Sequence, residues 1–247
     1  MEIITSIKNE KVIEWTKLKQ KKYRDLTNAF LVEGDHLVME ALKTNMVKEV
    51  IVDENKLFPV SVPTHYVTSE VLKKISDQPS TPDVIAVVNK IPELDLNNRI
   101  LLVDSLQDPG NLGTIIRSAV AFNIDTIVLG NNTVDQYNEK VIRASEGMLF
   151  HINIIHKDLN EFIPLLKTNG YQVLGTNVTH GTRLSEVRLH TKFAFIIGNE
   201  GNGVSEELLN LCDDYIYIPM NEACESLNAG VAAGIILYEI NNRYFGD

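Results

Sequence analysis

The stretch Ser-Leu-Asn-Ala-Gly-Val-Ala-Ala-Gly-Ile-Ile-Leu-Tyr at residues 226–238 decides the fold of this 247-residue chain. It predicts a long C-terminal helix with Ser226 as its N-cap and Asn228 buried in its first turn. A glycine inside a helix lowers the stability of the helix by roughly 0.5 to 1 kcal/mol relative to alanine, so the presence of Gly230 and Gly234 calls for a structural or functional explanation. Close packing against another helix would supply one, and close approach of a ligand or another chain segment would supply another.

Two earlier segments also place polar residues where a strand turns into a helix. In Asp-Pro-Gly-Asn-Leu-Gly at 108–113, the proline and glycines predict a tight turn, and the helix that follows offers free backbone N–H groups to an anion. Asn111 lies in this turn, and Arg117 lies about two helical turns further on, where it could bind a phosphate with both guanidinium nitrogens. A simple helix cap and a surface ion pair are the alternative.

The third polar turn, Gly-Asn-Glu-Gly-Asn-Gly at 198–203, does not match known phosphate-binding patterns. Its spacing is G-x-x-G-x-G, not the G-x-G-x-x-G of dinucleotide-binding folds, and the chain has no Walker sequence. The glycines would let backbone approach a flat ligand closely, with Glu200 as a polar contact. A loop held by left-handed glycines, with Glu200 in solvent, is the alternative.

Composition indicates an ordinary globular chain, 44% hydrophobic, with a net charge of -10. That charge argues against binding nucleic acid, which depends on phosphate neutralisation. The distribution of the charge weakens this objection, because the first 24 residues hold seven basic and three acidic side chains.

The two cysteines and six scattered histidines match no disulfide framework or metal site, so no metal is expected. No signal-peptide layout or membrane span is apparent, which predicts a cytoplasmic protein without membrane contact.

Hydrophobic patterning predicts two α/β domains. The boundary is placed in the polar, proline-containing stretch 91–98, which gives domains 1–95 and 99–247. In the second domain, strands and helices alternate and the strands are almost continuously apolar, which predicts a parallel sheet covered on both faces. Ligands of such sheets bind at the carboxyl ends of the strands, where the three polar turns lie. The helices expected there are 112–122, 138–147, 159–168, a short one from 205, and 226–243. The first domain is expected to hold helices 8–21, 35–44 and 69–76.

Taken together, the three segments resemble the ordered motifs of the SpoU, or TrmH-like, RNA ribose 2'-O-methyltransferases. The motifs are Asn111 with Arg117, then Ile-Ile-Gly-Asn-Glu-Gly at 196–201, then Ile-Pro-Met at 218–220 followed by Glu-Ser-Leu-Asn at 225–228. The basic N-terminal run and Phe-Leu-Val-Glu-Gly at 30–34 resemble that family's small substrate-binding domain, which is similar to ribosomal protein L30.

The resemblance implies a trefoil knot in the C-terminal α/β domain, S-adenosylmethionine as the methyl donor, RNA, expected to be ribosomal, as the substrate, and a homodimer with composite active sites. It places the cofactor against backbone near Thr176, Gly198, Ile218 and Leu227.

The family assigns to the residue matching Arg117 the activation of the ribose 2'-hydroxyl. A guanidinium has a pKa above about 12, so we expect Arg117 to hold the flanking phosphate and stabilise the developing alkoxide instead. Asn111, Glu200, Ser226 and Asn228 are expected to orient Arg117 and the RNA backbone.

The cations expected to contact RNA are Lys19, Lys21, Lys22, Arg24 and Arg143. The chain departs from the family at Ala229 and Gly230, where Val-Ser is common, and this departure bears on the substrate more than on the chemistry. Two alternatives to an active methyltransferase stay open: a knotted RNA-binding protein without catalysis, and another nucleotide-binding α/β enzyme.

Overall fold

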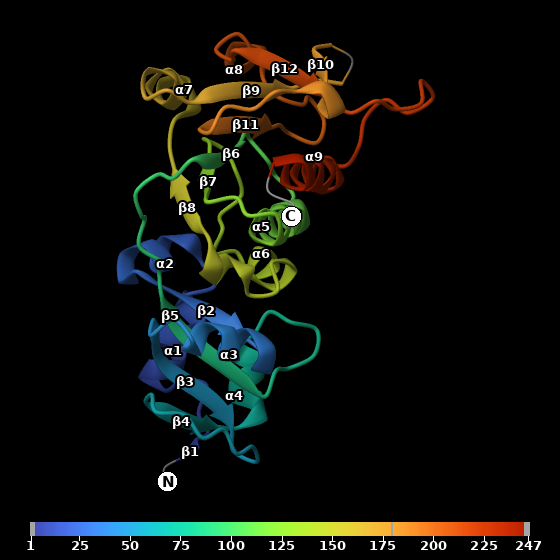
Figure 1. Cartoon of the computed structure of the whole chain (residues 1–247). Coiled ribbons are helices and arrows are strands. Elements are labelled where there is room, and N and C mark those ends of the chain that lie inside the picture. The colour runs from blue at the N-terminus through green and yellow to red at the C-terminus, as the bar shows by residue number, and fades with distance from the viewer. Residues whose placement is uncertain (1–2, 179, 245–247) are drawn as a thin grey trace. The chain divides into compact units, whose positions relative to one another are not determined.

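The computed structural model describes residues 3–178 and 180–244 and divides by its contacts into two units (Figure 1). The first unit holds the residues up to Pro92 together with Asp135–Phe150. The second holds Glu93–Val134 and the chain from His151 onward. The first junction lies close to the expected boundary, but the inclusion of Asp135–Phe150 in the first unit was not expected. The assignment of 1–95 to RNA binding stays a prediction.

The first unit is built on a five-stranded sheet of order β1-β4-β3-β5-β2. Strand β4 pairs in parallel with β1 and β3, whereas β5 pairs antiparallel with β2 and β3. The strands are β1 (Ile3–Ile4), β2 (Ala29–Glu33), β3 (Val47–Asp53), β4 (Thr64–Val67) and β5 (Val84–Asn89). The helices are α1 (Glu10–Lys17), α2 (Lys21–Thr27), α3 (Asp35–Leu42), α4 (Ser69–Ile75) and α6 (Glu139–Ala144), and the 3₁₀ turn η1 (Met148–His151) follows α6.

The basic N-terminal run forms two helices rather than one. Helix α1 begins after Asn9, whose side chain accepts a hydrogen bond from the backbone N–H of Lys11, and it buries Val12 and Trp15 in the core of the unit. Each such buried apolar side chain stabilises the fold by roughly 1.5 to 3 kcal/mol. Helix α2 ends at Thr27, and its C-cap Asn28 adopts the left-handed conformation.

Arg24 anchors the segment Asp135–Phe150 to the rest of the first unit. The residue is 6% exposed, and its Nη2 lies 2.6 Å from a carboxylate oxygen of Asp135. Its Nη1 donates to the carbonyls of Leu18 and Lys19 at 3.0 and 2.7 Å. A buried cation of this kind is costly unless it is paired, so these contacts must form together.

The second unit is built on a seven-stranded sheet of order β10-β12-β9-β11-β6-β7-β8, and every described pairing in it is parallel. The strands are β6 (Arg99–Val103), β7 (Thr126–Leu129), β8 (Asn153–His156), β9 (Gln172–Thr176), β10 (Thr182–Arg183), β11 (Phe193–Ile197) and β12 (Asp214–Tyr217). The helices are α5 (Pro109–Ala121), α7 (Leu159–Thr168), α8 (Glu206–Leu209) and α9 (Ala229–Tyr244), with a 3₁₀ turn η2 (Leu184–Glu186).

Both faces of this sheet are covered, because every residue of β11 is buried. One face packs on α7 and α8 through a core that includes Ile196, Phe162 and Leu208. Helices α5 and α9 lie side by side (Figure 1). A Cβ added at Gly230 of α9 would lie 3.2 Å from the Cγ2 of Thr114 on α5. Close helix packing is therefore the reason for this glycine.

The predicted class, a parallel-sheet α/β domain with a smaller α/β domain, is confirmed, and the knot stays a prediction. One prediction about α9 is wrong. The helix begins at Ala229, and Asn228, not Ser226, caps it by accepting hydrogen bonds from the N–H groups of Gly230 and Val231 at 3.0 and 3.2 Å. Asn228 is exposed rather than buried, because a cap lies outside the first turn.

Candidate active site

One residue from each of the three polar turns meets in a single hydrogen-bonded chain. The side-chain nitrogen of Asn111, in the first turn of α5, donates to Glu200 in the β11–α8 loop at 3.0 Å. The side-chain oxygen of Asn111 accepts from the side-chain nitrogen of Asn228 at 2.9 Å. The carboxyl ends of parallel strands β6 and β11 bring the first two together. The expected convergence of the motifs is thus observed.

The carboxamide of Asn111 is hydrogen-bonded through both its nitrogen and its oxygen, and it can still bind a ligand. An amide side chain has two N–H donors and two acceptor lone pairs, and the chain described above uses one of each. The helix start is fixed as well, because the Asp108 side chain accepts a hydrogen bond from the backbone N–H of Asn111 at 2.8 Å. Asn111 therefore presents one donor and one acceptor in a defined orientation.

Glu200 is ionised and its position is fixed by donors. Partial burial raises the pKa of Glu200, but hydrogen bonds from Asn111 and from the backbone N–H groups of Asp108 and Gln107 outweigh it. The net effect holds the pKa of this carboxyl below its usual value. A carboxylate with a lowered pKa is a weak base, so Glu200 is suited to orient Asn111 rather than to take a proton.

The loop 198–203 is held by its own backbone and by Asn199. The backbones of Asn199 and Gly203 exchange two hydrogen bonds of 2.9 Å, and the side-chain nitrogen of Asn199 donates to the carbonyl of Ser105. A Cβ at Gly198 would lie 2.0 Å from the carbonyl carbon of Gly203. Gly198 is thus required by the loop itself, in addition to the contact with the cofactor that was predicted for it.

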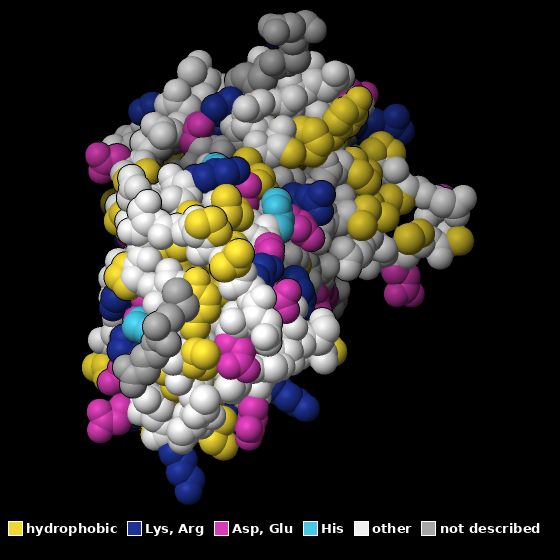
Figure 2. Space-filling model, turned by 90° about the horizontal axis from the view of Figure 1, so that it is seen from below, with side chains coloured by type: hydrophobic (Ala, Val, Ile, Leu, Met, Phe, Trp, Pro, Cys, Tyr) yellow, Lys and Arg dark blue, Asp and Glu magenta, His cyan; other side chains and the backbone are white. Residues whose placement is uncertain are grey.

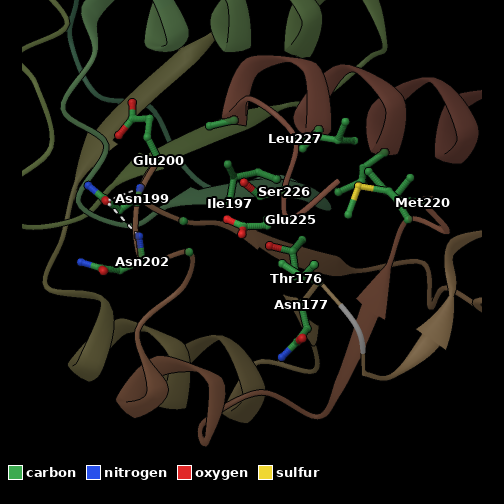
Figure 3. Close-up of a pocket in the computed structure, with 18 of the residues that line it drawn as sticks. Thr176, Asn177, Ile197, Asn199, Glu200, Asn202, Met220, Glu225, Ser226 and Leu227 are labelled. Atoms are coloured by element: carbon green, nitrogen blue, oxygen red, sulfur yellow. Dashed lines mark hydrogen bonds between the residues drawn. The ribbon is translucent and has the colours of Figure 1, made fainter. Parts of the chain in front are cut away.

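A pocket of about 310 Å³ opens beside this loop, between the ends of β9, β11 and β12 and the start of α9 (Figure 3). All four residues expected to contact the cofactor, Thr176, Gly198, Ile218 and Leu227, line it. Glu200 and Ser226 line it too, so two of the expected catalytic residues border the same space. Apolar side chains such as Ile216 and Ile236 form other parts of the wall. The pocket can therefore hold a flat, partly apolar ligand.

Arg117 lies outside the hydrogen-bonded chain of Asn111. Six residues along a helix correspond to about 9 Å of rise, which separates the two side chains on α5. Arg117 is exposed and has no hydrogen bond or ion pair with any described residue. Glu200, Asn228 and Ser226 therefore form no hydrogen bond or ion pair with Arg117 in this structure, and the part of the prediction that has them orient its guanidinium directly is not observed.

The cations predicted to contact RNA differ in their availability. Arg24 is buried and paired with Asp135, unlike the exposed position that a phosphate contact requires. Lys19 forms an ion pair with Asp77 at 2.9 Å, and Lys21 forms one with Asp25 at 3.1 Å. Lys22 and Arg143 are exposed, and no ion pair involves them within the described part of the chain. Figure 2 shows acidic and basic side chains interspersed on the face in view.

Sequence reasoning missed several residues that line the pocket, namely Asn177, Asn199, Asn202, Met220 and Glu225. Asn177 could have been found, because it directly follows a strand of a parallel sheet at its carboxyl end. The others lay within the quoted motifs without an assigned role.

Among the described residues, no cluster of His, Cys, Asp and Glu could hold a metal ion, and no helix is long and apolar enough to cross a membrane.

A parallel α/β unit with a pocket at the carboxyl ends of its strands defines a ligand-binding α/β protein, and the comparisons with known proteins specify the family. Residues 98–238 match the model of the SpoU rRNA Methylase family, and residues 9–86 match the MRM3-like substrate binding domain. The chain therefore belongs to the SpoU rRNA methylase family.

Relatives of known name support this membership along the whole chain. The chain is 42% identical to the 23S rRNA (guanosine(2553)-2'-O)-methyltransferase RlmP of Bacillus subtilis, over 97% of this chain and 99% of that protein. The SpoU methyltransferase AviRb of Streptomyces viridochromogenes, solved in complex with AdoMet, matches with a TM-score of 0.85 and 26% identity over 97% of this chain and all of the other. An AdoMet-bound rRNA methyltransferase of Sinorhizobium meliloti matches with a TM-score of 0.86 and 27% identity, over 99% and 98% of the two chains.

Proposed function

We propose that this chain transfers a methyl group from S-adenosylmethionine to a ribose 2'-hydroxyl of ribosomal RNA. The observation that carries the proposal is the convergence of Asn111, Glu200 and Asn228 beside the pocket at the carboxyl ends of the strands. Family membership supplies the reaction class. Another nucleotide-binding enzyme is disfavoured, because the chain lacks the phosphate-binding patterns of such enzymes.

The lining of the pocket fits S-adenosylmethionine. Backbone at Gly198 and apolar side chains at Ile218 and Leu227 suit a flat adenine and its ribose, and none of the described lining residues is a cation that would repel a sulfonium. When bound there, S-adenosylmethionine supplies an electrophilic methyl group. Thr176 is part of the same wall, and its hydroxyl donates to the carbonyl of Ile196 at 2.7 Å, which fixes the strand end against which the ligand would rest.

The chain's own residues contribute positioning and electrostatics to the reaction. Arg117 carries a permanent charge and five N–H donors without a described partner, so it can bind the phosphate beside the target ribose and stabilise the alkoxide that develops at the 2'-oxygen. Asn111, fixed by Glu200 and Asn228, offers its remaining donor and acceptor to the ribose. Ser226 borders the pocket with an exposed hydroxyl suited to the RNA backbone.

The substrate nucleotide that we propose is a guanosine of 23S ribosomal RNA. The support is the 42% identity, over nearly the full length of both chains, to a protein named for 2'-O-methylation of guanosine 2553 in that RNA. The first unit, whose residues 9–86 match a substrate binding domain, would bind the RNA. Action on ribosomal RNA supports the proposal that the protein works in the cytoplasm.

We also infer a homodimer with composite active sites. Three apolar side chains form a stripe along α9: Val231, Ile235 and Tyr238 are 50%, 38% and 56% exposed. Their spacing of four and three residues places them on one helix face. A second copy of the chain would cover this stripe, and it would also bring groups close to the exposed Arg117 on the neighbouring helix α5.

The test is methyl transfer from labelled S-adenosylmethionine to ribosomal RNA from cells that lack this protein. We expect label in one guanosine of 23S RNA, in a dinucleotide that resists alkaline hydrolysis because the 2'-hydroxyl is blocked. Label on a base or in transfer RNA would contradict the proposed substrate. No transfer by a protein that still binds ribosomal RNA would favour the inactive RNA-binding alternative.

A further inference from the structure

Glu225 lines the pocket with a carboxylate that has no described hydrogen-bond or ion-pair partner. Among the described lining residues, only Glu200 and Glu225 are charged, and both are acidic. Glu200 is committed to hydrogen bonds from Asn111 and from the backbone of Asp108, at 3.0 and 3.1 Å. Glu225 is exposed, and no described residue donates a hydrogen bond to its carboxylate or forms an ion pair with it. The close-up draws this carboxylate among the labelled pocket residues Ser226 and Thr176 (Figure 3).

A pocket whose described lining holds a carboxylate without a partner and no cation favours a ligand that carries positive charge. S-Adenosylmethionine and the product S-adenosylhomocysteine share the adenosine, the ammonium and the carboxylate, and they differ by one methyl group and by the positive charge on sulfur. Groups that contact the shared parts cannot distinguish the two. A carboxylate that acts on the sulfonium can, because this charge is present only before methyl transfer.

We propose that Glu225 is a specificity residue that makes the pocket prefer S-adenosylmethionine over S-adenosylhomocysteine. This inference rests on the proposed function, because it assumes that the pocket is the methyl donor site. Loss of the sulfonium charge then removes the attraction to Glu225, and the product is released more readily. Accumulated product consequently competes less with fresh methyl donor.

The experiment is calorimetric titration of the full-length protein with each of the two compounds at low and high salt. We expect Glu225→Gln to weaken binding of S-adenosylmethionine by about three- to tenfold, a range set by the exposure of the site. Binding of S-adenosylhomocysteine should change less than about twofold. The difference should shrink in about 0.5 M salt, where exposed charges are screened. Glu225→Lys should reverse the preference.

Glu222→Gln is the matched control, because Glu222 is an exposed acid of the same loop that does not line the pocket. It removes the same charge and should leave both affinities unchanged. Equal weakening of both compounds by Glu225→Gln would overturn the proposal, since it would place the carboxylate at the shared ammonium. No effect on either compound would overturn it as well. Failure of the unaltered protein to bind either compound would instead refute the proposed function.

Discussion

Asn111 gains its defined orientation from partners that lie 89 and 117 residues away in sequence. The carboxamide nitrogen donates to Glu200 and the carboxamide oxygen accepts from Asn228. Because an ionised carboxylate only accepts hydrogen bonds, Glu200 fixes which end of the amide faces it. A neutral amide held in this way can bind a ribose hydroxyl without moving during the reaction. Pre-organised donors of this kind typically contribute about a hundred- to a thousandfold in rate.

Arg117→Ala should reduce methyl transfer by at least about a hundredfold, because it removes the permanent charge proposed to stabilise the alkoxide. The fold should be unaffected, since the side chain is exposed and no described residue pairs with it. Single-turnover assays with ribosomal RNA measure the rate, and calorimetry with S-adenosylmethionine measures the affinity, which should stay nearly unchanged. A large loss of cofactor affinity would show that Arg117 acts in a different role.

Glu200 should make stability depend on pH in the acid range. Its pKa in the folded state is below its usual value of 4.5, so the ionised form stabilises the folded protein above that value. This contribution is lost as the pH falls through the folded-state pKa. Glu200→Gln should therefore lower the urea midpoint at neutral pH, and the gap from the unaltered protein should narrow on acidification. A gap that is the same at pH 7 and in the acid range would contradict this account.

Two of the three glycines in the loop between β11 and α8, Gly198 and Gly201, provide a variant and its control. A Cβ at Gly198 would overlap the backbone of Gly203 and Val204, at 2.0 and 2.1 Å, whereas a Cβ at Gly201 would meet only the Asn199 side-chain oxygen at 3.5 Å. Gly198→Ala should lower stability by about 1 to 3 kcal/mol and abolish cofactor binding, because the pocket wall must shift. Gly201→Ala should change neither. Thermal unfolding and calorimetry on both variants check this, and equal effects would contradict it.

Element positions were predicted well where periodicity was strong. Helix α7 has the bounds that were expected for it, because an amphipathic helix carries a clear pattern. Strands β1 and β10 were not expected, since two residues are too few to show alternation. The buried position of Arg24 could not be predicted either, because it depends on Asp135, which lies 111 residues away.

The sequence predicted where the candidate site lies but not which of its side chains bond to one another. The polar turns and their convergence follow from the rule that parallel strands present their carboxyl ends at one edge. Which side chains bond there does not follow from that rule, because it depends on the register of neighbouring strands and on loop backbone. Asn228 illustrates the point: its cap at the start of α9 and its bond to Asn111 both required the folded positions of two helices.

At the scale of the whole molecule, the apolar stripe of α9 predicts the oligomeric state. Light scattering should give twice the chain mass of 27.7 kDa at micromolar concentration. The double substitution Ile235→Asp with Tyr238→Asp should give a monomer, because each carboxylate would lose hydration in a dimer interface. The exposed Leu165→Asp is the control and should leave the mass unchanged. A fully active protein with the mass of one chain would refute the composite site.

The chain carries a net charge of -10, so RNA binding must depend on the cations that are exposed and not already paired with an acidic side chain. This condition changes which residues are expected to contact RNA phosphates. Arg24 is excluded by its burial, and Lys19 is largely neutralised by Asp77. Lys22 and Arg143 remain, with Lys21 as a partly paired neighbour on α2. All three belong to the first unit, since Asp135–Phe150 is part of it.

Replacing Lys21, Lys22 and Arg143 with Ser should therefore weaken ribosomal RNA binding and flatten its dependence on salt, by up to about 2 to 3 units of log-log slope if each cation meets a phosphate. The matched control replaces the exposed Lys48, Lys73 and Lys74 of the same unit, which removes equal charge. It should weaken binding only slightly, because long-range attraction between exposed charges is screened within about 10 Å. Filter binding over a salt series measures both slopes. Equal slopes for the two triple variants would mean that net charge, rather than these three positions, governs binding, and the contacts to RNA would then have to come from the second unit around Arg117.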